Sequence, residues 1–597
     1  MMNDKNFSIS DEGVKKMNEQ VQNWATSFFD QFSEMKQGDH GTPDGTKRIN
    51  SMMQEGFSKL MTNDPIEEWT SQVKLWQEYS NIWQQTFFGG SAKEDDKKKD
   101  RRFSSDLWSD QPVFDFIKKC YLTTAESIQE RVKNIEGLDE KTNREVAFYM
   151  DQYINAMSPS NFALTNPDVI KETIDTQGQN LVKGFENMMA DLKRNEGSGV
   201  LNIKMTDFDQ FTIGENIAIT PGKVVFENKL FQLIKYSPQT KKVHEVPLLI
   251  VPPFLNKYYI LDLNEKKSFV DWVVKQGYTV FMISWVNPDA SFKDMKFEQY
   301  MTDGIIPAAE LASAISGQEE INVIGYCIGG TVLAPTLAYL KAKKRKLFKS
   351  VTYFTCLLDF EDPGELGVFL SDDQVSELEK EMAEVGYLDG RRLAATFNLL
   401  RSNDLIWSYF VDHYLCGKEP FPFDLLYWNS DSVNIAGASH GYYLREMYLN
   451  NKLCKPGGLN FDGVDIDLTT VNIPTIFISA EKDHIAPWEA TYSGAKLCSG
   501  ETEFVLGGSG HIAGIVNPPE KMKYGFKTNK TLAETPQEWL ESSTEHTGSW
   551  WLYWEKWLKK QSGNLIDAKN LGNRKYKAIE DAPGRYVKAS ILDNAKK

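Results

Sequence analysis

The feature that most constrains the fold is a repeated alternation, from about residue 200 onward, between short apolar runs and amphipathic segments. Each apolar run has the length and the β-branched or aromatic content of a buried strand. The runs are VPLLIVPPF, YTVFMISW, INVIGYC, SVTYFTCLL, PTIFISAE and TEFVLGG. Segments with helical spacing, such as SFVDWVVKQG and IPAAELASAISG, lie between several of them. Buried strands that alternate with helices predict an open, mostly parallel α/β sheet.

Other parts of the chain have a different organisation. Apolar residues recur every three or four positions in residues 1–200, which predicts a mostly α-helical N-terminal domain. This spacing is clear at Val14, Met17, Val21, Trp24, Phe28 and Phe32. The segment GGSAKEDDKKKDRR, at 89–102, has the small and charged composition of a flexible linker. Residues 201–597 are the predicted catalytic domain, and the aromatic-rich interval at about 361–460 predicts a cap inserted into it.

Composition excludes several classes of function. The 597 residues carry 67 basic and 83 acidic side chains, and a net charge of −16 predicts no binding to nucleic acid. No stretch reaches the ~18 consecutive apolar residues of a membrane helix, and the first residues lack the apolar region of a signal peptide. The six cysteines include no C-x-x-C pair, so we expect neither disulfides nor a zinc site. These features together predict a cytoplasmic protein with reduced thiols and no transmembrane segment.

A cysteine occupies the turn after one predicted strand. INVIG is followed by a segment with helical spacing, so Cys327 lies where a strand passes into a helix. The pattern Gly325-Tyr326-Cys327-Ile328-Gly329 has Cys where a nucleophile elbow, G-x-S-x-G, has Ser. Such a turn is crowded, which requires small residues on both sides, and the following helix N-terminus favours a thiolate. Cys327 is therefore the candidate nucleophile.

An acid and a base follow in the order that this fold requires. Asp483 comes directly after the run PTIFISAE, and His511 follows TEFVLGG and a Gly-rich turn. The first gap leaves room for the inserted segment, and the second fits one helix and one strand. His484 is a rival base, but it neighbours the acid and is more readily structural. Cys356 lies inside an apolar strand, where a buried, inert thiol is the better interpretation.

The chemistry of acyl transfer follows from these residue types. His511 either removes the proton of Cys327 or holds it in a thiolate–imidazolium pair, and Asp483 orients His511 or receives its charge. An oxyanion would meet the backbone N–H of Ile328. Because prolines lack an N–H, Phe254 is the first further donor in the loop after VPLLIV. A Cys nucleophile suits exchange between thioesters, since one thiol replaces another.

The sequence resembles the class I polyhydroxyalkanoate (poly-3-hydroxybutyrate) synthases. The matching motifs run from about residue 100 to the C-terminus and include SPSNFALTNP, VPPFLNKYYILDL, GYCIGGT, LLDFEDPGELG, FDLLYWNSDS, DHIAPW, SGHIAGIVNPP and PGRYVK. The resemblance implies an α/β-hydrolase fold with an inserted cap behind a separate N-terminal domain. It implies an acyltransferase that polymerises (R)-3-hydroxyacyl-CoA into an intracellular polyester and releases CoA through an acyl-cysteine.

The same resemblance implies several further properties. The catalytic Cys, Asp and His of such enzymes fall on Cys327, Asp483 and His511, and no metal or redox cofactor is implied. The partners would be the CoA thioester, the growing polyester chain, a second copy in a homodimer, and the surface of a cytoplasmic polyester granule.

Two alternatives remain open from the residues alone. A thioesterase or polyester depolymerase could use the same three residues, because these do not distinguish transfer to a hydroxyl from transfer to water. A non-catalytic granule or scaffold protein would bury Cys327 and show no thiol reactivity. The role of Asp483 also stays open, between activating the 3-hydroxyl and only tuning His511.

Overall fold

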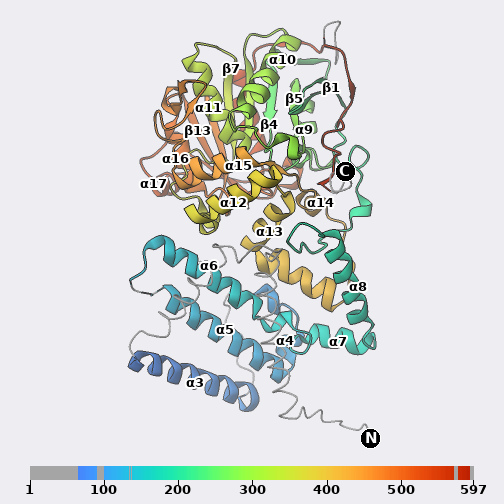
Figure 1. The fold of residues 1–597 in the computed structure, drawn as a ribbon, viewed down its shortest axis with the longest axis vertical. Coiled ribbons are helices and arrows are strands. Elements are labelled where there is room, and N and C mark those ends of the chain that lie inside the picture. The colour runs from blue at the N-terminus through green and yellow to red at the C-terminus, as the bar shows by residue number, and fades with distance from the viewer. Residues whose placement is uncertain (1–64, 90–99, 134, 136, 570–575, 592–597) are drawn as a thin grey trace. The chain divides into compact units, whose positions relative to one another are not determined.

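A computed structural model describes residues 65–89, 100–133, 135, 137–569 and 576–591 (Figure 1). The chain divides into two compact units. The first contains the residues up to Lys204 together with Ala395–Pro420, and the second contains Met205–Ala394 and Phe421–Lys597. The helical periodicity noted at 14–32 lies outside the described residues.

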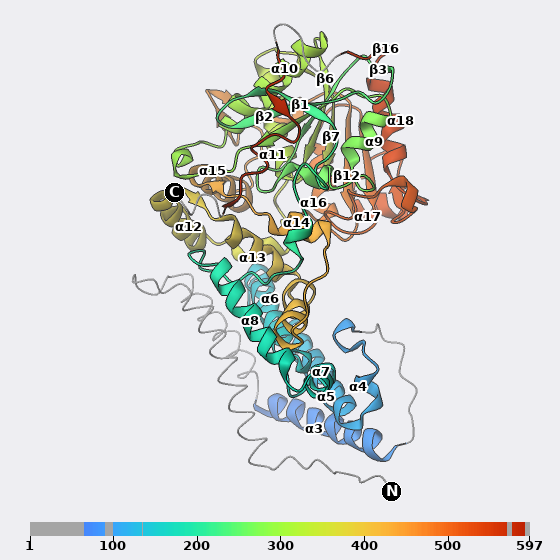
Figure 2. The same cartoon turned by 90° about the vertical axis from the view of Figure 1, so that its right-hand side faces the viewer.

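The first unit is helical, as the sequence predicts (Figures 1 and 2). Two of its helices begin at a side-chain cap. Asp139 accepts a hydrogen bond from the amide of Thr142 at the start of α6, and Asn166 caps α7 immediately before Pro167. The helices are α3 (Pro65–Phe88), α4 (Leu107–Asp110), α5 (Pro112–Lys133), α6 (Glu140–Ala156), α7 (Pro167–Asp175) and α8 (Gln179–Arg194).

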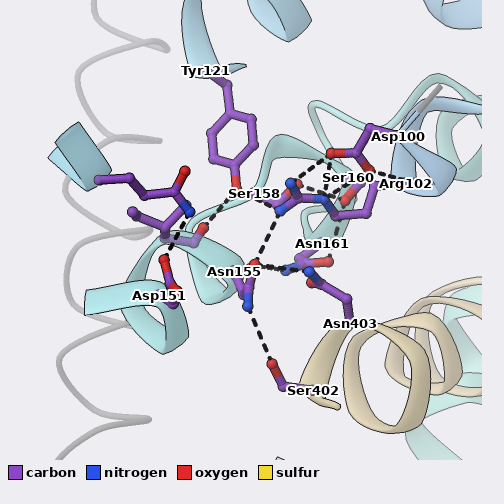
Figure 3. A network of polar contacts seen from close by, with 12 residues as sticks. Asp100, Arg102, Tyr121, Asp151, Asn155, Ser158, Ser160, Asn161, Ser402 and Asn403 are labelled. Atoms are coloured by element: carbon purple, nitrogen blue, oxygen red, sulfur yellow. Dashed lines mark hydrogen bonds and ion pairs between the residues drawn. The ribbon is translucent and has the colours of Figure 1, made fainter. Parts of the chain in front are cut away.

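The linker expected at 89–102 is shorter than predicted at its C-terminal end. Residues 90–99 lie outside the described residues, but Arg101–Phe103 forms a 3-10 helix with Asp100 as its N-cap. The guanidinium of Arg102 is paired with Asp100 at 2.7 Å and donates to the hydroxyl of Tyr121 at 2.6 Å (Figure 3). Asp100 and Arg102, whose charges are typical of a solvated linker, are thus paired with partners within the unit.

The cap interval at 361–460 also needs a correction, because Ala395–Pro420 groups with the N-terminal unit. Asn155 of α6 donates to the hydroxyl of Ser402 at 3.4 Å and accepts from the amide of Asn403 at 2.8 Å (Figure 3). Tyr414 donates to a carboxylate oxygen of Asp191 in α8 at 2.8 Å. Ala395–Pro420 belongs to the first unit because of hydrogen bonds between residues more than 200 positions apart in the sequence. Local periodicity does not predict such long-range partners.

The second unit is built on one eleven-stranded sheet, in the order β15-β14-β13-β12-β7-β6-β4-β5-β2-β1-β17. The strands from β13 to β5 pair in parallel, and antiparallel strands extend both edges. This confirms the predicted α/β sheet, and all six apolar runs supply strands. The strands are β1 (Gly222–Glu227), β2 (Phe231–Tyr236), β4 (Leu248–Val251), β5 (Val280–Trp285), β6 (Ile321–Tyr326), β7 (Phe348–Phe354), β12 (Thr475–Ala480), β13 (Thr502–Gly507), β14 (Phe526–Thr528), β15 (Thr544–His546) and β17 (Glu580–Asp581).

Helices cover both faces of this sheet. Every residue of β6 is buried, and alternate residues point into different cores: Ile321 and Val323 into one, Ile324 and Tyr326 into the other. Burial on both faces explains why the parallel strands read as continuous apolar runs. The helices of the sheet region are α9 (Phe269–Lys275), α10 (Ile306–Ser316), α11 (Ile328–Ala342), α16 (Trp488–Leu497), α17 (Pro536–Glu541) and α18 (Trp551–Gln561).

Between β7 and β12 the second unit carries the remaining cap segments. A capping box of Ser371 and Gln374 begins the first long helix of this interval. The cap segments are α12 (Asp372–Val385), α13 (Gly390–Leu400), which continues into the first unit, α14 (Asp424–Ser430), α15 (Gly437–Tyr442) and the π-helix η10 (Tyr443–Leu449). Among the described residues, no helix has both the length and the apolar character needed to cross a membrane.

Candidate active site

Cys327 stands at the junction of the central strand β6 and helix α11. It is the N-cap of α11 and has a φ of +51°, a conformation that a non-glycine residue adopts only under strain. Its amide donates to the carbonyl of Phe354 at 2.9 Å, and its carbonyl accepts from the amides of Gly330 and Thr331. These bonds hold the strained turn in place, with the side chain half-buried at the carboxyl edge of the sheet.

The glycines around Cys327 are required by close approach. A Cβ on Gly325 would lie 2.5 Å from the Cα of Gly330, and one on Gly329 would lie 2.4 Å from the carbonyl oxygen of Val251. Backbone atoms cannot move aside cheaply, so no larger residue fits at either position. The contact of Gly329 also shows that the start of α11 packs directly against the end of β4.

Asp483 and His511 meet at the same edge of the sheet. They follow β12 and β13, which are adjacent and parallel. One carboxylate oxygen of Asp483 accepts the amides of Ile485 and Ala486, each at 2.9 Å, and the other lies 2.7 Å from Nδ1 of His511. Both side chains are buried. Because Nδ1–H donates to the carboxylate, Nε2 is the ring nitrogen left to serve the nucleophile.

The electrostatics of His511 favour its protonated form. Burial alone would lower the pKa of His511, but the negative charge of Asp483, the charge of Cys327 and hydrogen bonds to both raise it to about 10. An imidazolium that is hydrogen-bonded to a thiol stabilises the thiolate. The three residues that the sequence predicts to act together are therefore brought together, and their charges favour the thiolate–imidazolium pair.

The contacts of the two rival residues differ from those of Cys327 and His511. Burial raises the pKa of the Cys356 thiol well above its usual value, and its sulfur lies 3.7 Å from the hydroxyl of Thr331. The Asp483 carboxylate accepts hydrogen bonds from two backbone amides and contacts Nδ1 of His511. Cys356 is thus a core residue, and His511 is the histidine that the acid orients.

The expected oxyanion donors lie on two segments that contact each other. Ile328 is the first residue of α11, and Phe254 lies in the loop after β4, whose carbonyls at Val251 and Pro252 contact Gly329. The ring of Phe254 stacks on that of Tyr300, with centroids 3.9 Å apart and planes at 11°. The structure therefore brings both backbone segments beside the elbow.

Two tyrosines of the cap, which sequence reasoning missed, lie near the nucleophile. Tyr443 and Tyr448, both on η10, are hydrogen-bonded to each other, with rings 5.3 Å apart. Burial is the main cause that raises the pKa of both phenols, and the nearby charge of Cys327 adds to it. The aromatic content of this interval was the only signal in the sequence. The raised pKa of both phenols keeps their hydroxyls neutral.

Comparison with known proteins identifies the family. Residues 99–273 match the family model described as poly-beta-hydroxybutyrate polymerase (PhaC) N-terminus. The chain is 44% identical to the poly(3-hydroxyalkanoate) polymerase of Methylorubrum extorquens over 531 residues, which are 88% of this chain and 87% of the relative. The chain belongs to the poly(3-hydroxyalkanoate) polymerases. The resemblance drawn from the motifs is confirmed.

A second relative and a second family model support this assignment. The polymerase is 45% identical to the poly(3-hydroxyalkanoate) polymerase subunit PhaC of Cupriavidus necator over 524 residues, 87% of this chain and 88% of that one. Residues 246–518 match the family model of the alpha/beta hydrolase fold. This range begins just before β4 and ends beyond His511, so it contains Cys327, Asp483 and His511. The predicted fold class is confirmed, and all three candidate residues of the polymerase lie in its hydrolase-like part.

Proposed function

We propose that this polymerase joins (R)-3-hydroxyacyl units from their CoA thioesters into a polyester, through an acyl thioester on Cys327. The observation that carries the proposal is the strained elbow cysteine beside a histidine whose pKa of about 10 keeps it protonated at neutral pH. Relatives that are named poly(3-hydroxyalkanoate) polymerases supply the substrate class.

The first step is acyl transfer to the enzyme. The Cys327 thiolate attacks the thioester carbonyl, and the amides of Ile328 and Phe254 stabilise the oxyanion. The bond to the CoA sulfur breaks, and the leaving thiolate takes the proton that His511 holds. Because one thioester replaces another, the step is close to balanced in free energy, which suits a cysteine nucleophile.

The second step forms the ester. The 3-hydroxyl of one unit attacks the acyl carbonyl on Cys327, neutral His511 accepts the hydroxyl proton, and the cysteine thiolate leaves. Both oxygens of Asp483 are already engaged, one by two amides and one by His511. This arrangement favours an orienting role for Asp483 over direct activation of the hydroxyl. No metal or redox cofactor takes part in either step.

The product distinguishes a polymerase from a hydrolase that uses the same residues. Water at ~55 M competes with the 3-hydroxyl, but well-oriented groups reach effective molarities of ~10⁵ M or more. We expect CoA release from (R)-3-hydroxybutyryl-CoA to be matched by insoluble polyester, with free 3-hydroxybutyrate a minor product. Assaying CoA, free acid and polymer in one reaction checks this. Stoichiometric free acid without polymer would instead identify a thioesterase.

Helix α8 has the surface expected of an element that contacts the apolar product. Its polar side faces inward: Asn180 donates to the carbonyl of Leu415 at 2.8 Å, and a Cβ on Gly184 would clash with the carbonyl of Tyr414. Its apolar side faces outward, with exposed side chains at Leu181, Val182, Phe185, Met189 and Leu192. A helix that buries polar groups and exposes apolar ones is suited to an apolar surface outside the chain.

We therefore propose that α8 attaches the enzyme to the surface of the cytoplasmic polyester granule, where the enzyme works as a homodimer. The double variant Phe185→Ser/Met189→Ser should lower the fraction bound to polyester particles by at least about tenfold, since each buried apolar side chain contributes ~1.5–3 kcal/mol. Sedimentation of the particles measures it, and Glu186→Gln on the same helix is the control. Unchanged particle binding with a lost dimer in light scattering would assign the face to a second copy.

A further inference from the structure

The loop that carries Phe254 lacks regular structure of its own. It follows β4 at Val251, contains Pro252 and Pro253, and reaches a 3-10 helix, η4 (Tyr258–Leu261), only after Lys257. A donor in an oxyanion site must be held within a fraction of an ångström to be effective. Contacts from outside the loop must therefore set the position of its amides.

One end of the loop is held by the sheet region. Trp285, the last residue of β5, donates from its indole to the carbonyl of Pro252 at 2.9 Å. The other end is held by the cap. The indole of Trp428 in α14 donates to the carbonyl of Lys257 at 2.7 Å, and Trp428 is only 4% exposed. Phe254 lies between these two anchored carbonyls.

A buried ion pair reinforces the anchor from the cap. The ammonium of Lys257 lies 2.7 Å from one carboxylate oxygen of Asp431, the C-cap of α14, and the other oxygen accepts the hydroxyl of Tyr259 at 2.8 Å. The side chains of Lys257 and Asp431 are 4% and 15% exposed. Burying such a pair adds little net stability, because both charges lose their hydration. We therefore expect the pair to fix the position of the loop relative to α14.

The first residue of α14 is also bound to the segment that follows the loop. Asp424 pairs with Lys267 at 2.6 Å and accepts from the amide of Asn264. These partners lie ten and thirteen residues beyond Phe254, whereas Lys257 lies three residues beyond it. Each end of the seven-residue helix α14 thus forms a Lys–Asp ion pair. The lysine of one pair lies close to Phe254 in the sequence, and the lysine of the other lies farther away.

We infer that Lys257, Asp431 and Trp428 are positioning residues that set the amide of Phe254 for oxyanion stabilisation, so that the cap completes the oxyanion site. This inference rests on the proposed function, in which Phe254 is an oxyanion donor. Helix α14 holds Lys257 at two points. Trp428 donates a hydrogen bond to the carbonyl of Lys257, and Asp431 pairs with its ammonium. A cap displaced from this position would leave the nucleophile intact but the oxyanion site incomplete.

The test separates oxyanion stabilisation from nucleophile reactivity. The full-length enzyme carries Lys257→Met/Asp431→Asn, which removes the ion pair without leaving one charge buried, or Trp428→Phe, which removes one hydrogen bond. Single-turnover CoA release measures acylation, and alkylation by iodoacetamide, a reaction without an oxyanion, measures Cys327. Losing a whole oxyanion donor costs ~10²–10³-fold. For a misplaced donor we expect acylation to fall about 10–100-fold through kcat, with KM and alkylation within about twofold.

A matched control decides between positioning and general support of the fold. Lys267→Met/Asp424→Asn removes the ion pair at the other end of α14, and we expect its acylation to stay within about threefold of the unmodified enzyme. Equal losses of acylation in the two double variants, or a parallel fall in alkylation, would overturn the inference. Retained CoA release in Cys327→Ala would overturn the proposed function instead, so the two failures are distinguishable.

Discussion

Cys327→Ala is expected to abolish CoA release from (R)-3-hydroxyacyl-CoA, a loss of more than about 10⁴-fold, while leaving the fold intact. The acyl group is transferred to the sulfur of Cys327. Removing the nucleophile of a catalytic triad lowers the rate about as much as removing all three of its residues. The half-buried side chain sits at the edge of the sheet, so its truncation disturbs little packing. Stopped-flow release of CoA, with circular dichroism as the check on folding, measures the effect.

Cys356→Ala is the matched control for this prediction. Cys356 is fully buried in the neighbouring strand connection, and burial raises the pKa of its thiol well above the usual value. Its replacement should cost stability through a small cavity but should leave acylation in place. Cys327→Ser should keep a trace of acylation, because the geometry survives with a weaker nucleophile. If Cys327→Ala released CoA at the original rate, another residue would be the nucleophile. A non-catalytic scaffold would instead release no CoA even as the unmodified protein.

His511→Gln should slow acylation of Cys327 by ~10²–10⁴-fold, the usual contribution of a general acid–base group. The variant loses the imidazolium that pairs with the thiolate and protonates the leaving CoA. Asp483→Asn should retain more acylation, because it weakens the orientation of His511 without removing the ring. Rapid-quench measurement of acyl-enzyme and of polymer separates the two steps. A much larger loss in elongation than in acylation for Asp483→Asn would show that this carboxylate activates the 3-hydroxyl.

The pH dependence of alkylation provides the second readout for His511. Its pKa is raised to about 10, so the ring keeps its proton throughout the neutral range and loses it only as the pH rises through about 10. In the unmodified enzyme, the imidazolium of His511 should therefore support alkylation of Cys327 by iodoacetamide to the same extent across the neutral range. In His511→Gln the rate should instead rise toward alkaline pH, as for a free thiol that titrates near ~8.5. Identical pH profiles for the two proteins would contradict the ion pair.

Much of the candidate site could be predicted from the chain because the relevant signals are local. Parallel strands present their carboxyl ends at one edge of a sheet, so residues that directly follow buried runs converge there. Cys327, Asp483 and His511 each follow such a run, and β6, β12 and β13 place them at that edge. The glycines of the elbow are also a local signal in the sequence, because the turn brings backbone atoms too close to these positions for a side chain to fit.

Other features depend on which distant residues share a hydrogen bond, and the sequence pattern does not contain that information. Helical spacing shows that α8 has one apolar and one polar face, but the buried carbonyls of Tyr414 and Leu415 decide that the polar face turns inward. The same reasoning separates Ala395–Pro420 from the rest of the cap. Lys257 and Asp431 lie 174 positions apart, and only the folded chain pairs them.

The sequence by itself determined the α/β class, the alternation of buried strands with helices, and the three candidate residues that follow strands. Periodicity and turn chemistry specify how each segment is buried, because burial is set by the side chains of that segment. The tertiary structure alone decided the partner of each buried polar group. It thereby decided that Ala395–Pro420 belongs to the first unit, that the apolar face of α8 is exposed, and that α14 is bound to the loop that carries Phe254. Many residues of a sequence could form a hydrogen bond or an ion pair with a given polar group. Which of them does so depends on their positions in the folded chain.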